Sequence, residues 1–218
     1  EFKGDLNMNL YERNQKVRNF FNEKIDTYDD VHSAFMETKR ALADSLDKDS
    51  KKILDLGAGT GLELIHLFEL FPEAQVTVID ITENMLEKLK TRSFSKQVTT
   101  ICGDFFEVEF GKDYDAVIST SALHHFKKEE KEVLYKKIYA CLKDNGQFLN
   151  CDRIALTEEF QNQQLYELEH NIDNYKHIDT PLTIANEIEV LQAAGFRNIT
   201  ADKVDLDDYS LLQGRKTK

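Results

Sequence analysis

The sequence predicts an α/β fold in which a doubly wound, mostly parallel sheet carries helices on both faces. Strand-like and helix-like patterns alternate from Lys52 onward, and a glycine-rich loop joins the first strand to the helix after it. Strand, helix and strand in succession give parallel strands joined by right-handed crossovers. Two short apolar segments near the C-terminal end are close enough in sequence to pair antiparallel.

Residues 10–25 and 31–46 carry apolar side chains at helical spacing, so two N-terminal helices are expected. The strands of the alternating region are expected at ILDL, VTVID, VTTIC, YDAVIS and GQFLNC. Helices between them are expected at 62–71, at 83–90, and through Val133, Leu134, Ile138 and Leu142.

The C-terminal part departs from this alternation. Residues 153–179 are polar and helix-prone, and TPLTIANEIEVLQAAGF follows them. In that stretch Thr180 is the expected N-cap, Pro181 the first helical residue and Gly195 the stop. The segments NITADKV and YSLLQGRK are expected to form the antiparallel pair. The length of 218 residues, without repeats or a low-complexity linker, favours one domain.

Charge and composition exclude several classes of partner. The formal net charge is −12, which disfavours nucleic acids and anionic lipid surfaces. No apolar run reaches the roughly 18 to 20 residues of a membrane span, and no signal peptide is recognised. The widely spaced Cys102, Cys141 and Cys151 predict no metal site and fit a reducing compartment. We therefore expect a cytoplasmic protein, in which residues 1–7, before Met8, are a non-native extension.

The stretch LDLGAGTGLE, residues 54–63, is the most informative motif. Gly57, Gly59 and Gly61 alternate directly after a strand, so backbone N–H groups are left open to an anionic group and main chain can approach a ligand closely. A plain strand-to-helix turn is the alternative. A dinucleotide loop would place its third glycine at position 62, where Leu62 stands, which disfavours a pyrophosphate. Asp55 suits a positively charged group, so a zwitterionic amino acid would match both features.

Two further carboxylates follow at the ends of the next strands. Asp80 lies 80 − 57 = 23 residues after the first glycine, near the spacing of a carboxylate that binds a ribose diol. Asp104, in GDFF beside Phe105, is placed to accept from an exocyclic amine, with Ile81 and Met85 flanking a flat ring. Taken alone, an aspartate at this position is more often a turn or cap residue.

These motifs, in this order at three strand ends, resemble the class I S-adenosylmethionine-dependent methyltransferases from about residue 28 to the end of the chain. They are most similar to small stand-alone bacterial and archaeal members with an LDLGAGTG loop and an SALHH segment. The resemblance implies a seven-stranded Rossmann-like sheet with its last strand antiparallel. It also implies S-adenosyl-L-methionine as the cofactor and a methylation activity.

The resemblance assigns roles to residues of this sequence. The loop of Gly57, Ala58 and Gly59 would contact the methionine moiety, Asp80 the ribose and Asp104 the adenine. Ser119 and Thr120 would lie near the methyl group. The expected cofactor-binding residues are Tyr28, Asp55, Gly57, Ala58, Gly59, Gly61, Asp80, Ile81, Met85, Gly103, Asp104, Phe105, Ser119 and Thr120.

The acceptor is specified less sharply. The segment STSALHH stands where some members of the resembled family carry Asn-Pro-Pro-Tyr or Asp-Pro-Pro-Tyr, which hold a base or amide nitrogen. The absence of that pattern disfavours methylation of such a nitrogen, so a small-molecule acceptor is expected. A tRNA- or other macromolecule-modifying methyltransferase and a non-catalytic S-adenosylmethionine-binding module stay open, whereas the glycine register disfavours a nicotinamide-dependent oxidoreductase. His124 and His125 are the candidate catalytic bases. Alternatively, one packs under the loop and the other caps the next helix. Asp152 and Tyr28 are candidates for acceptor contact.

The expected single domain, 1–218, divides into four parts. N-terminal helices occupy 8–48, a cofactor-binding core 50–152, a lid 153–180, and a C-terminal helix with a strand pair 181–218. The segment predicted to form the lid contains the apolar and aromatic residues Phe160, Leu165, Tyr166, Leu168, His170 and Tyr175. A structural helix or a homodimer contact would explain the same segment.

Overall fold

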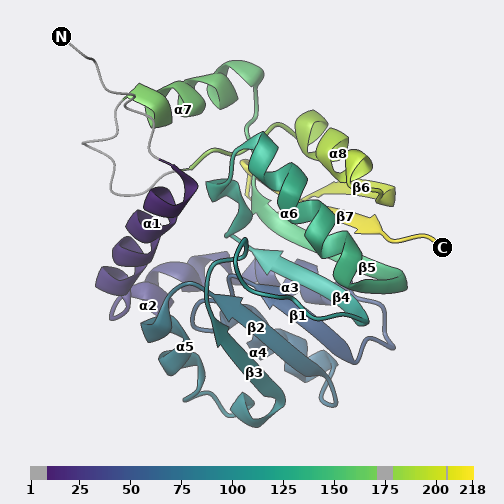
Figure 1. Cartoon of the computed structure of the whole chain (residues 1–218). Helices are drawn as coiled ribbons and strands as arrows, with labels where there is room; N and C mark the ends of the chain where they lie inside the picture. Colours follow the sequence, from purple (N-terminus) through teal and green to yellow (C-terminus); the bar gives the residue numbers. More distant parts are fainter. Residues whose placement is uncertain (1–8, 171–178, 205) are drawn as a thin grey trace.

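A computed structural model describes residues 9–170, 179–204 and 206–218 of the chain. In this part of the chain, seven strands form one sheet of order β3-β2-β1-β4-β5-β7-β6 (Figure 1). The strands are β1 Lys52–Leu56, β2 Gln75–Asp80, β3 Val98–Cys102, β4 Tyr114–Thr120, β5 Leu142–Arg153, β6 Arg197–Lys203 and β7 Tyr209–Arg215. Strand β7 is antiparallel to β5 and β6, and the pairs from β3 to β5 are parallel. The predicted fold class is confirmed.

The helices lie on both faces of this sheet. They are α1 Leu10–Lys24, α2 Tyr28–His32, α3 Met36–Asp44, α4 Leu62–Leu70, α5 Glu83–Leu89, α6 Lys128–Cys141, α7 Glu158–His170 and α8 Ile184–Ala193. One core cluster joins strand residues to α6 and α8, and a second joins them to α3, α4 and α5. Neighbouring residues of β1 belong to opposite clusters, Ile53 to the second and Leu54 to the first. Burial on both faces explains why the central strands read as nearly continuous apolar runs.

Three predicted boundaries were wrong. The second N-terminal helix is interrupted by a 3₁₀ turn at Ser33–Phe35, between α2 and α3. Leu142 begins β5 and does not end α6; it pairs with Tyr114 of β4, and the register then shifts before Gln147 pairs with Ala116. Asp152, expected just past the fifth strand, lies within β5.

The predicted start of the last helix is also wrong. Thr183 is the N-cap of α8, since its side chain accepts from the N–H of Asn186. Thr180 instead donates its N–H to the carbonyl of His124 at 2.7 Å, and the carbonyl of Leu182 accepts from Ala155. These long-range bonds hold the segment before α8 in a non-helical path. A capping preference read from sequence cannot reveal them.

Part of the predicted lid is α7, in which Leu168 is buried while Phe160 and Tyr166 are exposed. Tyr175 lies outside the described residues, so the assignment of 153–180 as a lid remains a prediction. Among the helices of the described ranges, none is both long and apolar enough to cross a membrane.

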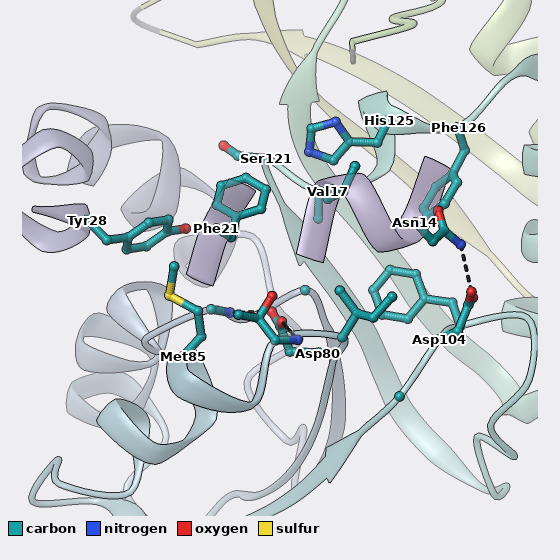
Figure 2. Close-up of a pocket in the computed structure, with 17 residues that line it drawn as sticks. Asn14, Val17, Phe21, Tyr28, Asp80, Met85, Asp104, Ser121, His125 and Phe126 are labelled. Carbon is teal, nitrogen blue, oxygen red and sulfur yellow. Dashed lines mark hydrogen bonds between the residues drawn. The ribbon is translucent and has the colours of Figure 1, made fainter. Parts of the chain in front are cut away.

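The fold positions the site through parallel strand direction. Strands β1, β2, β3 and β4 end at the same edge of the sheet, so the loops after them meet there. Helix α1 lies over this edge, and its Asn14, Val17 and Phe21 point toward the strand ends (Figure 2).

Candidate active site

A pocket of about 640 Å³ lies at the carboxyl edge of the sheet, beneath α1 (Figure 2). Its described lining is Asn14, Val17, Phe21, Tyr28, Gly57, Gly59, Asp80, Ile81, Thr82, Met85, Gly103, Asp104, Phe105, Ser121, Ala122, His125 and Phe126. The pocket therefore joins loops from four strands to one face of the N-terminal helix.

Most of the residues expected to bind a cofactor come together here. The lining includes Tyr28, Gly57, Gly59, Asp80, Ile81, Met85, Gly103, Asp104 and Phe105. The other expected residues lie outside the described lining, namely Asp55, Ala58, Gly61, Ser119 and Thr120. Of the two candidate bases, His125 lines the pocket and His124 lies behind it.

The glycine loop approaches its neighbours too closely for a side chain. Gly57 has φ +80°, and a Cβ there would lie 2.4 Å from the Cβ of Ala122. Gly59 has φ +52°, and a Cβ there would meet the hydroxyl of Tyr28 at 3.0 Å. Left-handed backbone combined with this crowding requires glycine at both positions. Gly61 does not line the pocket. A Cβ there would lie 3.0 Å from the side chain of Leu89, so glycine allows the start of α4 to pack against α5.

Asp80 is fixed by two backbone donors. Its carboxylate accepts from the N–H of Gly59 at 2.9 Å and from the N–H of Thr82 at 2.7 Å. Burial raises the pKa of Asp80, and these two hydrogen bonds oppose that rise. The side chain therefore ties the loop after β1 to the end of β2 while it lines the pocket. A carboxylate held in this way is oriented before any ligand arrives.

Asp104 makes a local turn, which was its alternative role, and it also lines the pocket. Its Oδ1 accepts from the N–H of Phe106 two residues further on, which is a local turn. Its Oδ2 accepts from the side-chain amide of Asn14 at 2.7 Å (Figure 2). The carboxylate thus both lines the pocket and anchors α1.

Tyr28 forms an aromatic wall beside the loop. Its ring stacks on His32 with centroids 3.9 Å apart and meets Phe21 edge-on at 6.1 Å. Burial raises the pKa of Tyr28, and the charges of Glu63 and Asp80 raise it further. The phenol is therefore neutral at physiological pH and can donate a hydrogen bond.

A charged network is buried beneath the glycine loop. Lys39 of α3 lies 3.3 Å from Glu63 and 3.1 Å from the hydroxyl of Thr120. Asp55 is fully buried, and both of its carboxylate oxygens lack a hydrogen-bond partner among the described residues. Burial and then Glu63 raise the pKa of Asp55 well above its ordinary value. The buried carboxyl of Asp55 therefore supports the loop from below, in surroundings that favour its protonated form.

Ser119 and Thr120 are already engaged elsewhere. The Ser119 hydroxyl donates to the carbonyl of Leu56 at 2.8 Å, and Thr120 belongs to the buried network with Lys39. The next residues, Ser121 and Ala122, line the pocket. The lining at this strand therefore begins two residues later than the sequence suggested, at Ser121 in place of Ser119.

The two histidines belong to a network of carboxylates. His124 Nδ1 is 2.6 Å from Asp152, and its Nε2 is 3.3 Å from Oδ1 of Asp179. His125 Nδ1 is 3.4 Å from the same Asp179 oxygen. Burial alone would lower the pKa of His124, but the charges of Asp152 and Asp179 raise it to about 9. His124 is therefore a cation at neutral pH. The ligand atoms of His124, His125 and Asp179 lie within 4.8 Å of one another, the spacing of a potential metal site.

Sequence reasoning missed seven lining residues, which are Asn14, Val17, Phe21, Thr82, Ser121, Ala122 and Phe126. The three from α1 were detectable in part, because spacings of three and four residues put them on one helix face. Nothing local shows what that face covers. Its position depends on remote contacts, including the Asn14–Asp104 bond and a buried ion pair between Arg13 and Glu130.

Comparison with known families gives one match. Residues 53–146 match the model of a methyltransferase domain. This segment contains β1 to β4 and α6, together with the loops at their carboxyl ends.

Curated relatives extend the likeness. The chain is 29% identical over 143 residues to malonyl-[acyl-carrier protein] O-methyltransferase of Priestia megaterium, which covers 62% of this chain and 50% of that protein. It is 26% identical over 206 residues to carboxy-S-adenosyl-L-methionine synthase of Nautilia profundicola, covering 87% of this chain and 88% of that one. The chain spans about half of the length of several curated relatives that it matches.

A solved structure agrees with the fold. Human N-acetylserotonin methyltransferase, crystallised in complex with S-adenosylmethionine, has a TM-score of 0.70 and 24% identity. The match covers 91% of this chain and 56% of the human one.

Proposed function

Because the chain belongs to the class I S-adenosylmethionine-dependent methyltransferases, we propose that it transfers the methyl group of S-adenosylmethionine to a small-molecule acceptor. One observation carries the proposal. The glycine loop, Asp80 and Asp104 come from three different strand ends and line one pocket in the order that an amino acid, a ribose and an adenine require. The human structural neighbour was crystallised in complex with the same cofactor, which supports this choice of ligand.

The proposed cofactor position follows from these groups. The methionine moiety would lie against Gly57 and Gly59, with the phenol of Tyr28 beside it. Asp80 would accept from the ribose hydroxyls, because its carboxylate is already oriented by two backbone donors. The adenine would lie between Met85 and Phe105, near Asp104. Asn14 already donates to Asp104, so an adenine amine would share or displace this bond.

Methyl transfer from a sulfonium needs little covalent help, since the donor is already activated. Holding the acceptor in line with the S–CH₃ bond can supply most of the acceleration, with effective molarities on the order of 10⁵ M or more. The acceptor side of the pocket would be Phe21, Ser121 and His125. Of the two candidate bases we propose His125, because it lines the pocket whereas His124 is held as a cation behind it.

A small acceptor is supported by the pocket and by charge. Helix α1 covers the pocket, which suits a ligand that fits beneath it. The net charge of −12 opposes a nucleic-acid backbone as the acceptor. The malonyl-[acyl-carrier protein] O-methyltransferase relative modifies a carrier-bound group by name, but this chain spans only half of its length.

Cofactor binding can be tested directly by calorimetry and thermal shift with S-adenosylhomocysteine. We expect Asp80→Asn to weaken binding at least tenfold, since the neutral amide accepts less strongly from the ribose. Asp115→Asn is the matched control. Asp115 also accepts from two backbone N–H groups, those of Lys51 and Lys52, but it lies at the opposite edge of the sheet. If S-adenosylhomocysteine produces neither heat nor a thermal shift in the wild type, the proposal is wrong.

A second candidate is modification of the cofactor itself. It is supported by the carboxy-S-adenosyl-L-methionine synthase relative, which matches this chain over 88% of its own length. Incubation of a metabolite extract with methyl-labelled S-adenosylmethionine separates the two functions. A labelled acceptor together with S-adenosylhomocysteine supports methyl transfer, whereas a heavier S-adenosyl compound that retains the label supports the second candidate.

A further inference from the structure

Asp179 lies where it can act on the base of the proposed function. It comes immediately before the segment that leads into α8, and the next residue, Thr180, donates its N–H to the carbonyl of His124. One oxygen of Asp179 is 2.7 Å from Arg153, which is itself 2.9 Å from Asp208. Arg153 therefore holds one oxygen of the Asp179 carboxylate, and the other oxygen points at the two histidines.

The two histidines differ in the surroundings of their ring nitrogens. Both ring nitrogens of His124 face carboxylates, Asp152 at 2.6 Å and Asp179 at 3.3 Å, and the ring is 5% exposed. His125 turns Nδ1 toward Asp179 at 3.4 Å, and its ring lines the pocket against Phe21, with centroids 6.0 Å apart. A carboxylate at Nδ1 favours the tautomer that carries its proton there, which leaves Nε2 as the acceptor nitrogen.

We propose that Asp179 is a positioning residue that fixes His125 as a general base, and that the methyl acceptor is therefore a hydroxyl, a thiol or an ammonium group. This inference rests on the proposed methyl transfer. An acceptor that is already an anion, such as a carboxylate, has no proton to lose and needs no base. Among the described residues, Asp179 and His124 face His125, with Asp152 and Arg153 behind them and uncharged Phe21 on the α1 side.

With a hydroxyl acceptor, the O–H bond breaks and its proton goes to Nε2 of His125, while the oxygen forms a bond to the methyl carbon. The C–S bond breaks, and its electron pair stays on sulfur to give the neutral thioether S-adenosylhomocysteine. The imidazolium then loses its proton to solvent. Asp179 stabilises the imidazolium but takes no proton itself.

A divalent cation is the competing use of the same three side chains, since their ligand atoms lie within 4.8 Å of one another. Two contacts favour the base. The second oxygen of Asp179 is already paired with Arg153, and both ring nitrogens of His124 already face carboxylates.

The positioning role can be tested without knowing the acceptor. Long-range ¹H–¹⁵N spectra of the histidine side chains report the tautomer of His125 in the protein saturated with S-adenosylhomocysteine. We expect the Nδ1–H form in the wild type and a shift toward Nε2–H in Asp179→Asn. Asp208→Asn is the matched control, because it removes the other carboxylate on Arg153 without touching His125. An Nε2–H tautomer in the wild type, or an unchanged tautomer in Asp179→Asn, overturns the proposal.

Acceptor chemistry provides the second readout. Phenols of decreasing pKa serve as probe acceptors. On a phenol that is protonated at the assay pH, Asp179→Asn should lose about 10²-fold in kcat. The loss should shrink toward onefold on a nitrated phenol that is already ionised, and Asp179→Glu should restore part of the rate. An equal loss on both phenols, or activity that a chelator removes and a divalent metal restores, overturns the proposal. Unchanged S-adenosylhomocysteine binding in the variant shows that the proposed function survives either result.

Discussion

The charge on His124 should make the stability of the protein depend on pH above neutrality. The pKa of His124 rises from 6.5 to about 9, since the nearby Asp152 and Asp179 outweigh the opposing effect of burial. A group whose pKa is raised on folding contributes stability that is complete below its unfolded pKa and is lost as pH rises through the folded pKa. The window is therefore pH 6.5 to about 9.

The magnitude follows from the two pKa values. At about 1.36 kcal/mol for each pKa unit, the rise from 6.5 to about 9 corresponds to roughly 3 kcal/mol. For a chain of this length, about 2–4 °C of melting temperature accompanies each kcal/mol. The wild type should therefore lose on the order of 6 to 12 °C between pH 6.5 and pH 9 through this group alone.

Replacement of His124 by glutamine isolates the effect. Asp152 keeps the N–H groups of Leu123, His124 and Arg153, so the variant retains the local fold. Urea unfolding followed by circular dichroism at pH 6, 7.5 and 9 gives the free energy of unfolding of each protein. We expect the variant to be roughly 3 kcal/mol less stable than the wild type at pH 6 and nearly equal to it above pH 9.

His66→Gln is the matched control. His66 also lies between two carboxylates, Asp44 and Glu69, but both of these are largely exposed. Exposed pairs of this kind contribute between about 0 and 1 kcal/mol. Parallel curves for wild type and His124→Gln from pH 6 to pH 9 would refute the reasoning, because the difference between the proteins must shrink as His124 loses its proton.

Two further substitutions test the glycine loop and the network beneath it. Gly57→Ala should cost about 1–3 kcal/mol and abolish the thermal shift with S-adenosylhomocysteine, because its Cβ meets Ala122 at 2.4 Å. Gly111→Ala shares the left-handed backbone but meets its nearest atom at 3.5 Å, so a cost equal to that of Gly57→Ala would contradict the clash. Lys39→Met should cost about 3–5 kcal/mol in urea unfolding by leaving Glu63 buried without its cation, and the double variant Lys39→Met, Glu63→Leu should recover most of it. If the double variant is as unstable as the single one, the unpaired charge is not the cause.

The sheet and the glycine loop were predictable because their signals are local. Strand segments with continuous apolar character, and glycines at alternate positions after the first, report burial on both faces and a close approach of the backbone. The carboxylates Asp80 and Asp104 were also predictable, since Asp80 ends β2 and Asp104 lies two residues past the end of β3. Parallel strands bring such ends to one edge whatever the loops between them do.

The roof of the pocket was not predictable in the same way. The residues Asn14 and Phe21 face the strand ends through contacts with Asp104 and His125, which are 90 or more positions away. Asp179 is a similar case, because its two histidine partners lie more than 50 residues earlier. The start of α8 was misplaced for the same reason: Thr180 bonds to His124 instead of capping a helix.

Helix α1 has a consequence for how ligands come and go. The glycine loop and the carboxylates form the floor of the pocket, whereas α1 closes it from above through the Asn14–Asp104 bond and the Arg13–Glu130 ion pair. A ligand on that floor would also touch α1 through Asn14, Val17 and Phe21. Sequence changes in the first helix can therefore alter how the ligand is covered while the floor beneath it stays the same.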